Sequence, residues 1–169
     1  MNGTDKDKDN APVYLRRDVR PEDPDHVERI VASTGFFNPE EIQVARSLVE
    51  EHLRNGPGCG YHFLFAQRGD RPAGYACYGP ILGTDRRFDL YWIAVDPAHQ
   101  KMGLGRLLLE ATEEAVRALG GRKIYVETSS RALYEPTRRF YLKAGYGIEA
   151  VLQDFYAPED HKIILSKTL

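Results

Sequence analysis

Hydrophobic residues recur along this chain with two different spacings, and the spacing changes several times between its ends. A repeat of three or four residues makes one face of a helix apolar, whereas alternating or short continuous apolar runs between turn residues favour strands. Helical spacing occupies four segments: Pro24–Ser33, the stretch between Asn38 and Gly56, Arg106–Leu119 and Pro136–Ala144. Strand spacing occupies Val13–Arg17, Tyr61–Gln67, Ala73–Gly79, Phe88–Val95, Lys123–Thr128, Gly147–Phe155 and His161–Leu165.

These segments follow the order β-α-α-β-β-β-α-β-α-β-β. The second and third strands flank the short turn Arg68–Arg71, which is typical of an antiparallel hairpin. Helices inserted between later strands are typical of a mixed architecture. We therefore predict a mixed α/β (α+β) fold, in which about four helices flank a central, twisted, mostly antiparallel sheet of about six or seven strands.

The best helix start signal lies before the second helix. Asn38 is suited to cap it, Pro39 fits the first turn, and Glu41 stands where a capping box places its acidic residue.

The first residues of the chain have a different composition. Residues 1–11 alternate aspartate and lysine without an apolar anchor. We predict a disordered polar tail over residues 1–11 and a single domain over residues 12–169.

Composition excludes several classes of function. The net charge of −2 gives no basic footprint for nucleic acid, and no apolar run approaches the ~20 residues of a membrane span. Two cysteines make no disulfide framework, and the five histidines show no metal-ligand spacing, so we predict no metal site. We expect a cytoplasmic protein with reduced thiols, and both a monomer and a homodimer remain open.

The most informative stretch is the glycine-containing run Gln100–Arg106. It follows the strand pattern that ends at Val95 and opens the third helix. The first turn of a helix has free N–H groups, and its dipole favours an anion there. Gly103 and Gly105 carry no side chain, so a phosphate group can approach the backbone closely. The run therefore predicts a phosphate cradle.

Two common phosphate-binding motifs do not fit this run. A P-loop needs Gly-Lys followed by serine or threonine, which the run lacks. A dinucleotide fingerprint needs a third glycine where this chain has Leu108. A simple glycine turn before a helix remains the alternative to a cradle.

The wider frame resembles a known family. The stretch Asp96–Leu108 resembles the acetyl-coenzyme A signature of the GCN5-related N-acetyltransferases (GNAT), and Arg139–Tyr146 is similar to the family's late helix. The resemblance covers roughly Tyr61–Leu169 and implies a GNAT-like fold with acetyl-coenzyme A as the bound cofactor. Met102 departs from the family, which often has a basic residue there, and Tyr134 replaces a frequent asparagine.

The resemblance also implies which residues contact the coenzyme. The end of the strand before the loop exposes backbone groups to the pantetheine arm, and one of its N–H groups meets the thioester carbonyl. The loop itself receives the pyrophosphate. The implied coenzyme contacts are Ile93, Ala94, Val95, Gln100, Lys101, Met102, Gly103, Leu104, Gly105, Arg106, Ser129 and Tyr134.

Catalytic roles follow in the same way. Tyr141 matches the family's helix tyrosine, which assists the departing thiolate. Asp89 stands eleven residues before Gln100, where histone-acetylating members have a glutamate base. Glu127 is the rival at the same position of the next strand, and ordered water alone is the third possibility for the base.

Exposed aromatic residues are the candidates for an acceptor pocket. Phe36 and Phe37 lie between the first two helices, and Tyr156 lies in the closing turn. Tyr91 shares a strand face with Asp89, because side chains alternate along a strand. If buried, these residues are only core.

The leading hypothesis is an acyltransferase that transfers acetyl from acetyl-coenzyme A to a primary amine of a small molecule, peptide or protein, by direct attack in a ternary complex. The alternative is a non-catalytic acyl-coenzyme A-binding sensor or scaffold, which shares the cradle but needs no Tyr141. The acceptor and the choice of acetyl over a longer acyl chain are left open.

Overall fold

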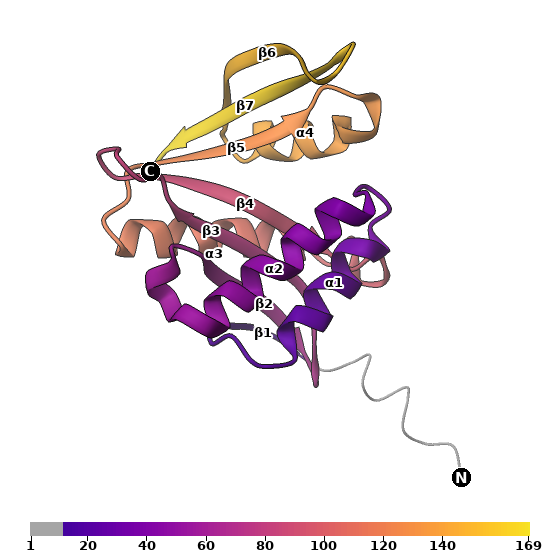
Figure 1. The fold of residues 1–169 in the computed structure, drawn as a ribbon, viewed down its shortest axis with the longest axis vertical. Coiled ribbons are helices and arrows are strands. Elements are labelled where there is room, and N and C mark those ends of the chain that lie inside the picture. The colour runs from indigo at the N-terminus through magenta and orange to yellow at the C-terminus, as the bar shows by residue number, and fades with distance from the viewer. Residues whose placement is uncertain (1–11) are drawn as a thin grey trace. The chain divides into compact units, whose positions relative to one another are not determined.

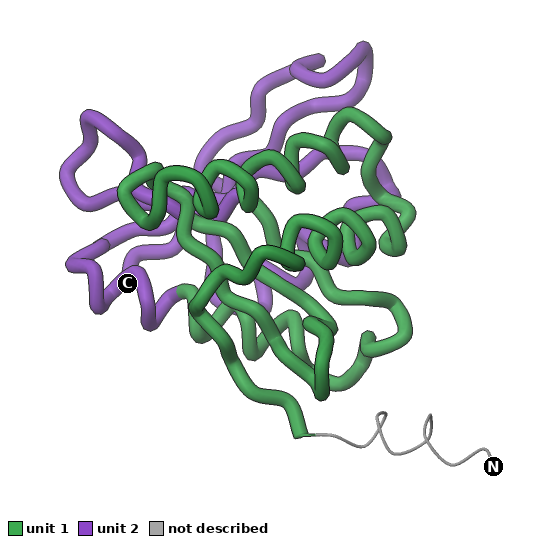
Figure 2. Tube along the Cα trace, turned by 60° about the horizontal axis from the view of Figure 1, so that its bottom comes forward, with its two compact units in different colours: residues 1–78, 92–112 green, residues 79–91, 113–169 purple. Residues whose placement is uncertain are grey.

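The computed structural model describes residues 12–169, so the tail predicted over residues 1–11 lies outside the described part. The chain forms two compact units, coloured separately in Figure 2. The first runs to Tyr78 and resumes over Trp92–Thr112, and the second comprises Gly79–Tyr91 and Glu113–Leu169. The division falls within three secondary-structure elements. The single domain over residues 12–169 stays a prediction.

Residues 12–169 contain four α-helices and a seven-stranded sheet (Figure 1), whose hydrogen-bonded order is β1-β2-β3-β4-β5-β7-β6. Strands β4 and β5 pair in parallel, whereas β1–β2, β2–β3, β5–β7 and β6–β7 are antiparallel. The predicted element order and mixed fold class are confirmed. The elements are β1 (Val13–Arg16), α1 (Asp23–Ser33), α2 (Pro39–Asn55), β2 (His62–Arg68), β3 (Arg71–Pro80), β4 (Arg87–Val95), α3 (Leu104–Ala118), β5 (Lys123–Ser129), α4 (Glu135–Lys143), β6 (Gly147–Ala157) and β7 (Asp160–Thr168).

Helix α2 begins with the predicted capping box. The Asn38 side chain accepts a hydrogen bond from the Glu41 N–H at 2.9 Å, and the Glu41 carboxylate accepts from the Asn38 N–H at 2.8 Å. Two N–H groups that the helix itself leaves without acceptors are thereby satisfied.

The first unit is organised around a hydrophobic core beneath α1 and α2, which run side by side in Figure 1. Amphipathic spacing along each helix turns its apolar face toward β2 and β3. Burying one valine, isoleucine or phenylalanine side chain contributes about 1.5–3 kcal/mol to the stability of the fold. The core residues are Val27, Ile30, Val31, Ala45, Val49, Phe63, Phe65, Tyr75, Cys77 and Ala94.

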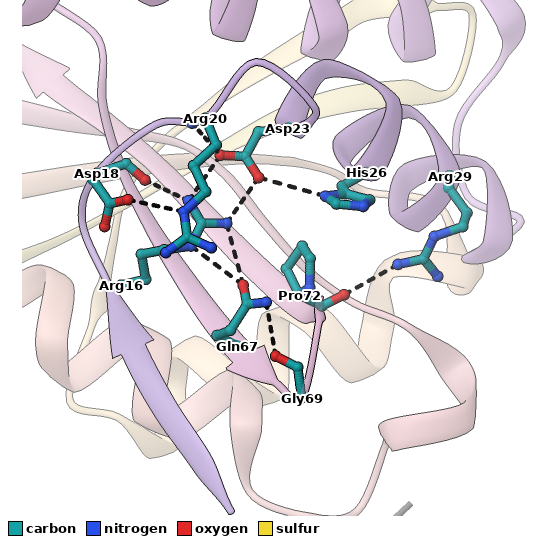
Figure 3. Close-up of polar contacts among 9 residues, drawn as sticks. All are labelled: Arg16, Asp18, Arg20, Asp23, His26, Arg29, Gln67, Gly69 and Pro72. Carbon is teal, nitrogen blue, oxygen red and sulfur yellow. Dashed lines mark hydrogen bonds and ion pairs between the residues drawn. The ribbon is translucent and has the colours of Figure 1, made fainter. Parts of the chain in front are cut away.

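A buried ion pair ties β1 to the start of α1 in this unit (Figure 3). Arg16 donates from both terminal nitrogens to the two Asp23 carboxylate oxygens at 2.8 Å, and the side chains are only 3% and 0% exposed. Gln67 of β2 accepts from Arg16 Nε at 3.2 Å and donates to the Gly69 carbonyl at 3.1 Å. Buried charges are tolerated only when they are paired and hydrogen-bonded. This network satisfies that condition and links β1, β2 and the start of α1.

The second unit contains the first part of β4 with β5, β6 and β7. In the parallel pair, Asp89 lies opposite Tyr125. In the antiparallel pair of β5 with β7, Glu127 lies opposite Ile164, and Ser129 lies opposite Lys162. These registers decide which side chains of neighbouring strands share a face.

A long bulge interrupts the pairing of β6 with β7. Leu152 pairs with Lys162 and Ala157 with Asp160, so residues 153–156 lie opposite the one residue 161. The N–H of Asp154, which has a positive φ of 51°, donates to Nδ1 of His161 at 2.9 Å. This hydrogen bond therefore connects the bulge to β7, although residues 153–156 interrupt the regular strand pairing.

Helix α3 differs from its prediction at both ends. It begins at Leu104, two positions before the predicted Arg106, and Leu104 is buried. It ends at Ala118, and Leu119 is 54% exposed. The loop geometry explains the early start, because the positive φ of Gly103 (76°) turns the chain directly into the helix.

Candidate active site

The loop between β4 and α3 has a definite conformation in the first unit. The Asp96 side chain accepts from the Ala98 N–H at 3.0 Å and pairs with Arg29 at 2.7 Å. Lys101 and Gly103 both lie in the left-handed region, at φ 67° and 76°. Successive residues with alternating backbone handedness turn their N–H groups toward a common concave side, which suits an anion.

The helix that follows adds further donors. The Leu107 N–H bonds to the Gly103 carbonyl at 3.0 Å, so it is the first amide of α3 to reach back into the loop. The preceding amides, Leu104 to Arg106, belong to the turn that a helix leaves without intrahelical acceptors. A Cβ built on Gly103 would meet no atom within 4 Å, so there is open space above this loop. Backbone donors and open space fit a bound phosphate group.

The side chains of this loop contribute less than its backbone. Gln100 and Lys101 are exposed, and Met102 is 49% exposed with its sulfur 3.3 Å from a terminal nitrogen of Arg68. Arg106 pairs with Glu110 one turn later at 2.7 Å, and that hydrogen bond raises the pKa of Arg106. Part of the positive charge expected from Arg106 is therefore already matched by a carboxylate.

The strand end Ile93–Val95 belongs to the first unit as well. Ala94 is buried, and its two neighbours are half-buried. Just beyond it, the Asp96 N–H bonds to the Ala73 carbonyl of β3 at 2.8 Å. A Cβ on Gly74 would meet the Ala94 carbonyl oxygen at 2.9 Å, so the close approach at this point requires glycine. The pantetheine role of Ile93, Ala94 and Val95 stays a prediction.

A cavity of about 160 Å³ lies in the second unit, and it brings both candidate bases together. Asp89, Leu90 and Tyr91 reach it from β4, and Tyr125 and Glu127 reach it from β5. The parallel pairing of these strands places the two carboxylates on one wall. The cavity combines anionic and aromatic surface, which suits a cationic organic group.

Asp89 is electrostatically unusual. Burial, followed by the nearby Glu127 carboxylate, raises the pKa of Asp89 to about 6, and the Lys162 ammonium opposes this rise. The group is ionised at neutral pH, yet it is a stronger base than an ordinary aspartate of pKa ~3.9. A carboxylate in a cavity with this pKa can accept a proton.

Glu127 has a different partner. Its carboxylate pairs with the Lys162 ammonium at 2.7 Å, and the side chains are 50% and 13% exposed. The same ammonium lies 3.7 Å from the ring centre of Phe155 and 5.7 Å from that of Tyr156 on the β6 bulge. Among the two carboxylates of the cavity, Asp89 is therefore the better candidate for the base.

Tyr141 lies on α4 in the second unit and is 4% exposed. Its ring packs edge-on against Phe140 at 5.2 Å and against Tyr146 at 5.4 Å. Burial raises the pKa of Tyr141 well above its usual range. The hydroxyl therefore keeps its proton at any physiological pH, so it is suited to donate a hydrogen bond rather than to ionise.

The residues at the end of β5 have local partners. The Ser129 hydroxyl hydrogen-bonds to Asp160 and accepts from the Arg131 N–H at 3.1 Å. Tyr134 lies with its ring 5.4 Å from the Arg131 guanidinium. These contacts stabilise the turn that leads into α4. Serine commonly plays such a loop-capping role. The predicted coenzyme contacts of Ser129 and Tyr134 stay predictions.

The aromatic acceptor candidates divide into two groups. The ring centres of Phe37 and Trp92 are 4.8 Å apart, beside the core of the first unit. Phe36 is half-buried, and its ring centre is 6.4 Å from that of Phe37. Tyr91 lines the cavity and is 39% exposed, and Tyr156 on the bulge is 48% exposed. Exposure therefore favours Tyr91 and Tyr156 as acceptor contacts, whereas Phe37 also serves as core.

Two residues of this region escaped the sequence-based candidates, namely Tyr125 and Lys162. Tyr125 enters the cavity through its pairing with Asp89, and Lys162 reaches Glu127 diagonally across the β5–β7 ladder. Both relations depend on strand register, which leaves no local signal in the chain.

Across residues 12–169, no cluster of three or more histidine, cysteine or acidic side chains could hold a metal ion. In the same residues, no helix is both long enough and apolar enough to span a membrane.

The chain matches the Acetyltransferase (GNAT) family over residues 27–146. It therefore belongs to the GNAT acetyltransferase family, which confirms the resemblance found in the sequence. No curated protein gives a significant match to the chain.

Solved structures agree with this assignment. A protein from Desulfovibrio desulfuricans, assigned to the acetyltransferases of the GNAT family, is 54% identical with a TM-score of 0.92, and the match covers 93% of this chain and 99% of that chain. An aminoglycoside 6'-N-acetyltransferase complexed with coenzyme A is 21% identical, with a TM-score of 0.73 and coverages of 92% and 96%. The ribosomal-protein-S18-alanine N-acetyltransferase from Escherichia coli is 19% identical, with a TM-score of 0.73 and coverages of 93% and 94%. At these lower identities, the last two show a common fold.

Proposed function

We propose that this chain is an N-acetyltransferase that transfers acetyl from acetyl-coenzyme A to a primary amine of a small molecule, peptide or protein. The observation that carries the proposal is the Asp89 carboxylate, which lines a cavity and has its pKa raised to about 6. An amine substrate arrives mainly as an ammonium with a pKa near ~10 and must lose a proton. Membership of the GNAT family supports acetyl transfer as the reaction.

Direct attack by the amine accords with the cavity lining. The five lining residues are Asp89, Leu90, Tyr91, Tyr125 and Glu127. None is a serine or cysteine that could carry the acetyl group, so the lining favours a ternary complex over a covalent acyl-enzyme.

We also propose cytoplasmic location, since Cys59 and Cys77 are free thiols.

The donor-binding role falls to the loop before α3. Its positive-φ residues Lys101 and Gly103, with the amides of Leu104 to Arg106, supply backbone donors for the pyrophosphate. When bound, acetyl-coenzyme A supplies the thioester whose C–S bond breaks as the N–C bond forms. Backbone N–H groups of Ile93 to Val95 are the proposed donors to the thioester oxygen, where one preorganised donor can contribute about 3–4 kcal/mol.

Asp89 and Tyr141 divide the proton handling. Transfer of a proton from a free ammonium to a carboxylate of pKa about 6 is uphill by ~4 units. Asp89 accepts one proton from the bound ammonium, and the neutral amine that forms attacks the thioester carbonyl carbon, which draws this uphill step forward. Formation of the N–C bond makes the nitrogen acidic, and its second proton ends on the departing coenzyme A sulfur, to which Tyr141 donates a hydrogen bond. The proton on Asp89 then passes to water.

A panel of amines tests the function. Release of free thiol from acetyl-coenzyme A is measured with polyamines, amino acids, aminoglycosides and peptide N-termini, and acetylation is verified by the mass of the acceptor. Transfer to at least one amine class is expected. Tight binding of coenzyme A without transfer to any amine would favour a non-catalytic acyl-coenzyme A sensor instead.

The cradle itself gives a binding prediction. Gly103→Val places a branched side chain in the open space above the loop at φ 76°, so calorimetry should show coenzyme A affinity falling by about tenfold or more. Gly83→Val is the matched control, because Gly83 has φ 77° and equally open surroundings in another loop. Equal losses in both variants would mean that backbone strain, rather than the cradle, is responsible.

Tyr141→Phe removes one hydroxyl and keeps the packed ring. Turnover is expected to fall by about 10²-fold with little change in coenzyme affinity, because the hydrogen bond strengthens only as charge develops on sulfur. Tyr146→Phe is the control, since it removes a second buried tyrosine hydroxyl from the same unit, on a ring that packs against Tyr141. Steady-state rates at saturating acetyl-coenzyme A measure the effect, and full turnover in Tyr141→Phe contradicts the assigned role.

A further inference from the structure

Lys162 is the feature of the second unit that neither the family motifs nor the proposed reaction uses. Its ammonium is held between a carboxylate and an aromatic ring, 2.7 Å from Glu127 and 3.7 Å from the ring centre of Phe155. At 13% side-chain exposure it is well enclosed for a lysine. The ordered bulge of β6 presents the ring, through the hydrogen bond between the Asp154 N–H and His161.

This ammonium determines the charge of the cavity. Asp89 and Glu127 bring two carboxylates to its wall, and Lys162 compensates one of them, so the group carries one net negative charge at neutral pH. The other polar residues that line the cavity, Tyr91 and Tyr125, bring phenol hydroxyls and neither a carboxylate nor an ammonium. One anionic position is thus left for a cation that enters the cavity.

We propose that Lys162 is a specificity-determining residue, an internal counter-cation that restricts the acceptor to amines with a single ammonium group. The inference rests on the proposed function, since it assigns the cavity to the acceptor. A monoamine places its one ammonium at Asp89, which can then accept its proton. A diamine of the same length brings a second positive charge toward Glu127, where the Lys162 ammonium already lies.

The physical basis is a competition for one carboxylate. Replacing Lys162 with methionine keeps the apolar stem against the Phe155 ring and removes the charge. Glu127 then becomes available to a second ammonium of the substrate, and repulsion from Lys162 is lost. Solvent screens such charge–charge interactions, since the Glu127 side chain is 50% exposed. We expect a net change of about tenfold.

The test compares 1-aminobutane with 1,4-diaminobutane on wild type, Lys162→Met and Lys162→Arg. Two readouts are taken: kcat/KM for acetyl transfer, and calorimetric binding of each amine without acetyl-coenzyme A. In Lys162→Met, the preference for diamine over monoamine should rise about tenfold in both readouts. Lys162→Arg keeps the charge and should keep the wild-type preference. Lys143→Met removes an exposed lysine of the same unit as a control for net charge.

The outcomes separate the two proposals. A shifted binding preference without acetyl transfer in any variant supports the role of Lys162 and rejects the proposed reaction. An unchanged preference in Lys162→Met, or the same shift in Lys162→Arg, overturns the role of Lys162 whether or not transfer occurs. Failure of both amines to bind any variant also overturns it.

The pH dependence gives a second readout that loss of packing alone would not move. Lys162 lowers the pKa of Asp89 against the opposing effects of burial and Glu127. Carboxyl NMR titration should therefore show the pKa of Asp89 higher in Lys162→Met than in wild type, and near the wild-type value in Lys162→Arg. An Asp89 titration that is the same in all three proteins removes the electrostatic basis of the proposal.

Discussion

Replacing Asp89 with asparagine is expected to lower kcat/KM for acetyl transfer by about 10²- to 10⁴-fold, the range that a positioned general base contributes. Asparagine keeps the size of the side chain but cannot accept the amine proton. The deficit should be greatest near pH 7, where wild-type Asp89 is ionised above its pKa of about 6 and free amine is scarce. It should shrink toward pH ~10, where the amine itself loses its proton.

The same Asp89→Asn variant should be more stable than wild type at neutral pH, although it is less active. Because the pKa of Asp89 is raised in the folded chain, ionisation of Asp89 destabilises the fold. This penalty is absent below the unfolded pKa of ~3.9 and complete above about 6. Asp89→Asn should therefore increase the free energy of unfolding at pH 7, measured by urea denaturation, and give little change at pH 4.

A matched control for this variant lies in the preceding loop. Asp85→Asn removes a carboxylate that is 79% exposed, so it should leave both activity and stability near wild type. If Asp89→Asn retained full activity across the pH range, water or Glu127 would become the candidate base. If it lost activity and stability together, Asp89 would be a structural residue.

The second large effect concerns the buried ion pair of the first unit (Figure 3). Asp23→Asn leaves the Arg16 guanidinium, whose side chain is 3% exposed, without its carboxylate partner. Breaking one side of a buried pair typically costs 3–5 kcal/mol, because a desolvated charge remains. We expect the free energy of unfolding to fall by about that amount, measured by urea denaturation at constant pH.

Asp18→Asn is the control for this network. Asp18 pairs with Arg20 at 3.0 Å, and its side chain is 64% exposed, so its loss should change stability by less than about 1 kcal/mol. The double variant Arg16→Met with Asp23→Leu should recover much of the loss, because it removes both charges. Equal small effects in Asp23→Asn and Asp18→Asn would mean that water compensates the buried guanidinium.

The sequence by itself determined the features that depend on near neighbours. The capping box of Asn38 and Glu41, the element order and the family of the chain were all predicted correctly. Each rests on residues close together in the chain, where periodicity, caps and turn residues act within one or two turns. The early start of α3 at Leu104 shows the limit, since the positive φ of Gly103 was not foreseen.

Only the tertiary structure decided how distant side chains share a site. The pairing of Asp89 with Tyr125 in β4 and β5 forms one wall of the cavity, and the register of β7 brings Lys162 to Glu127. Strand register depends on the packing of whole sheets, and a slip of one residue would turn every side chain to the other face. The choice between Asp89 and Glu127 follows from burial and ionic partners, which exist only once strands far apart in sequence have come together.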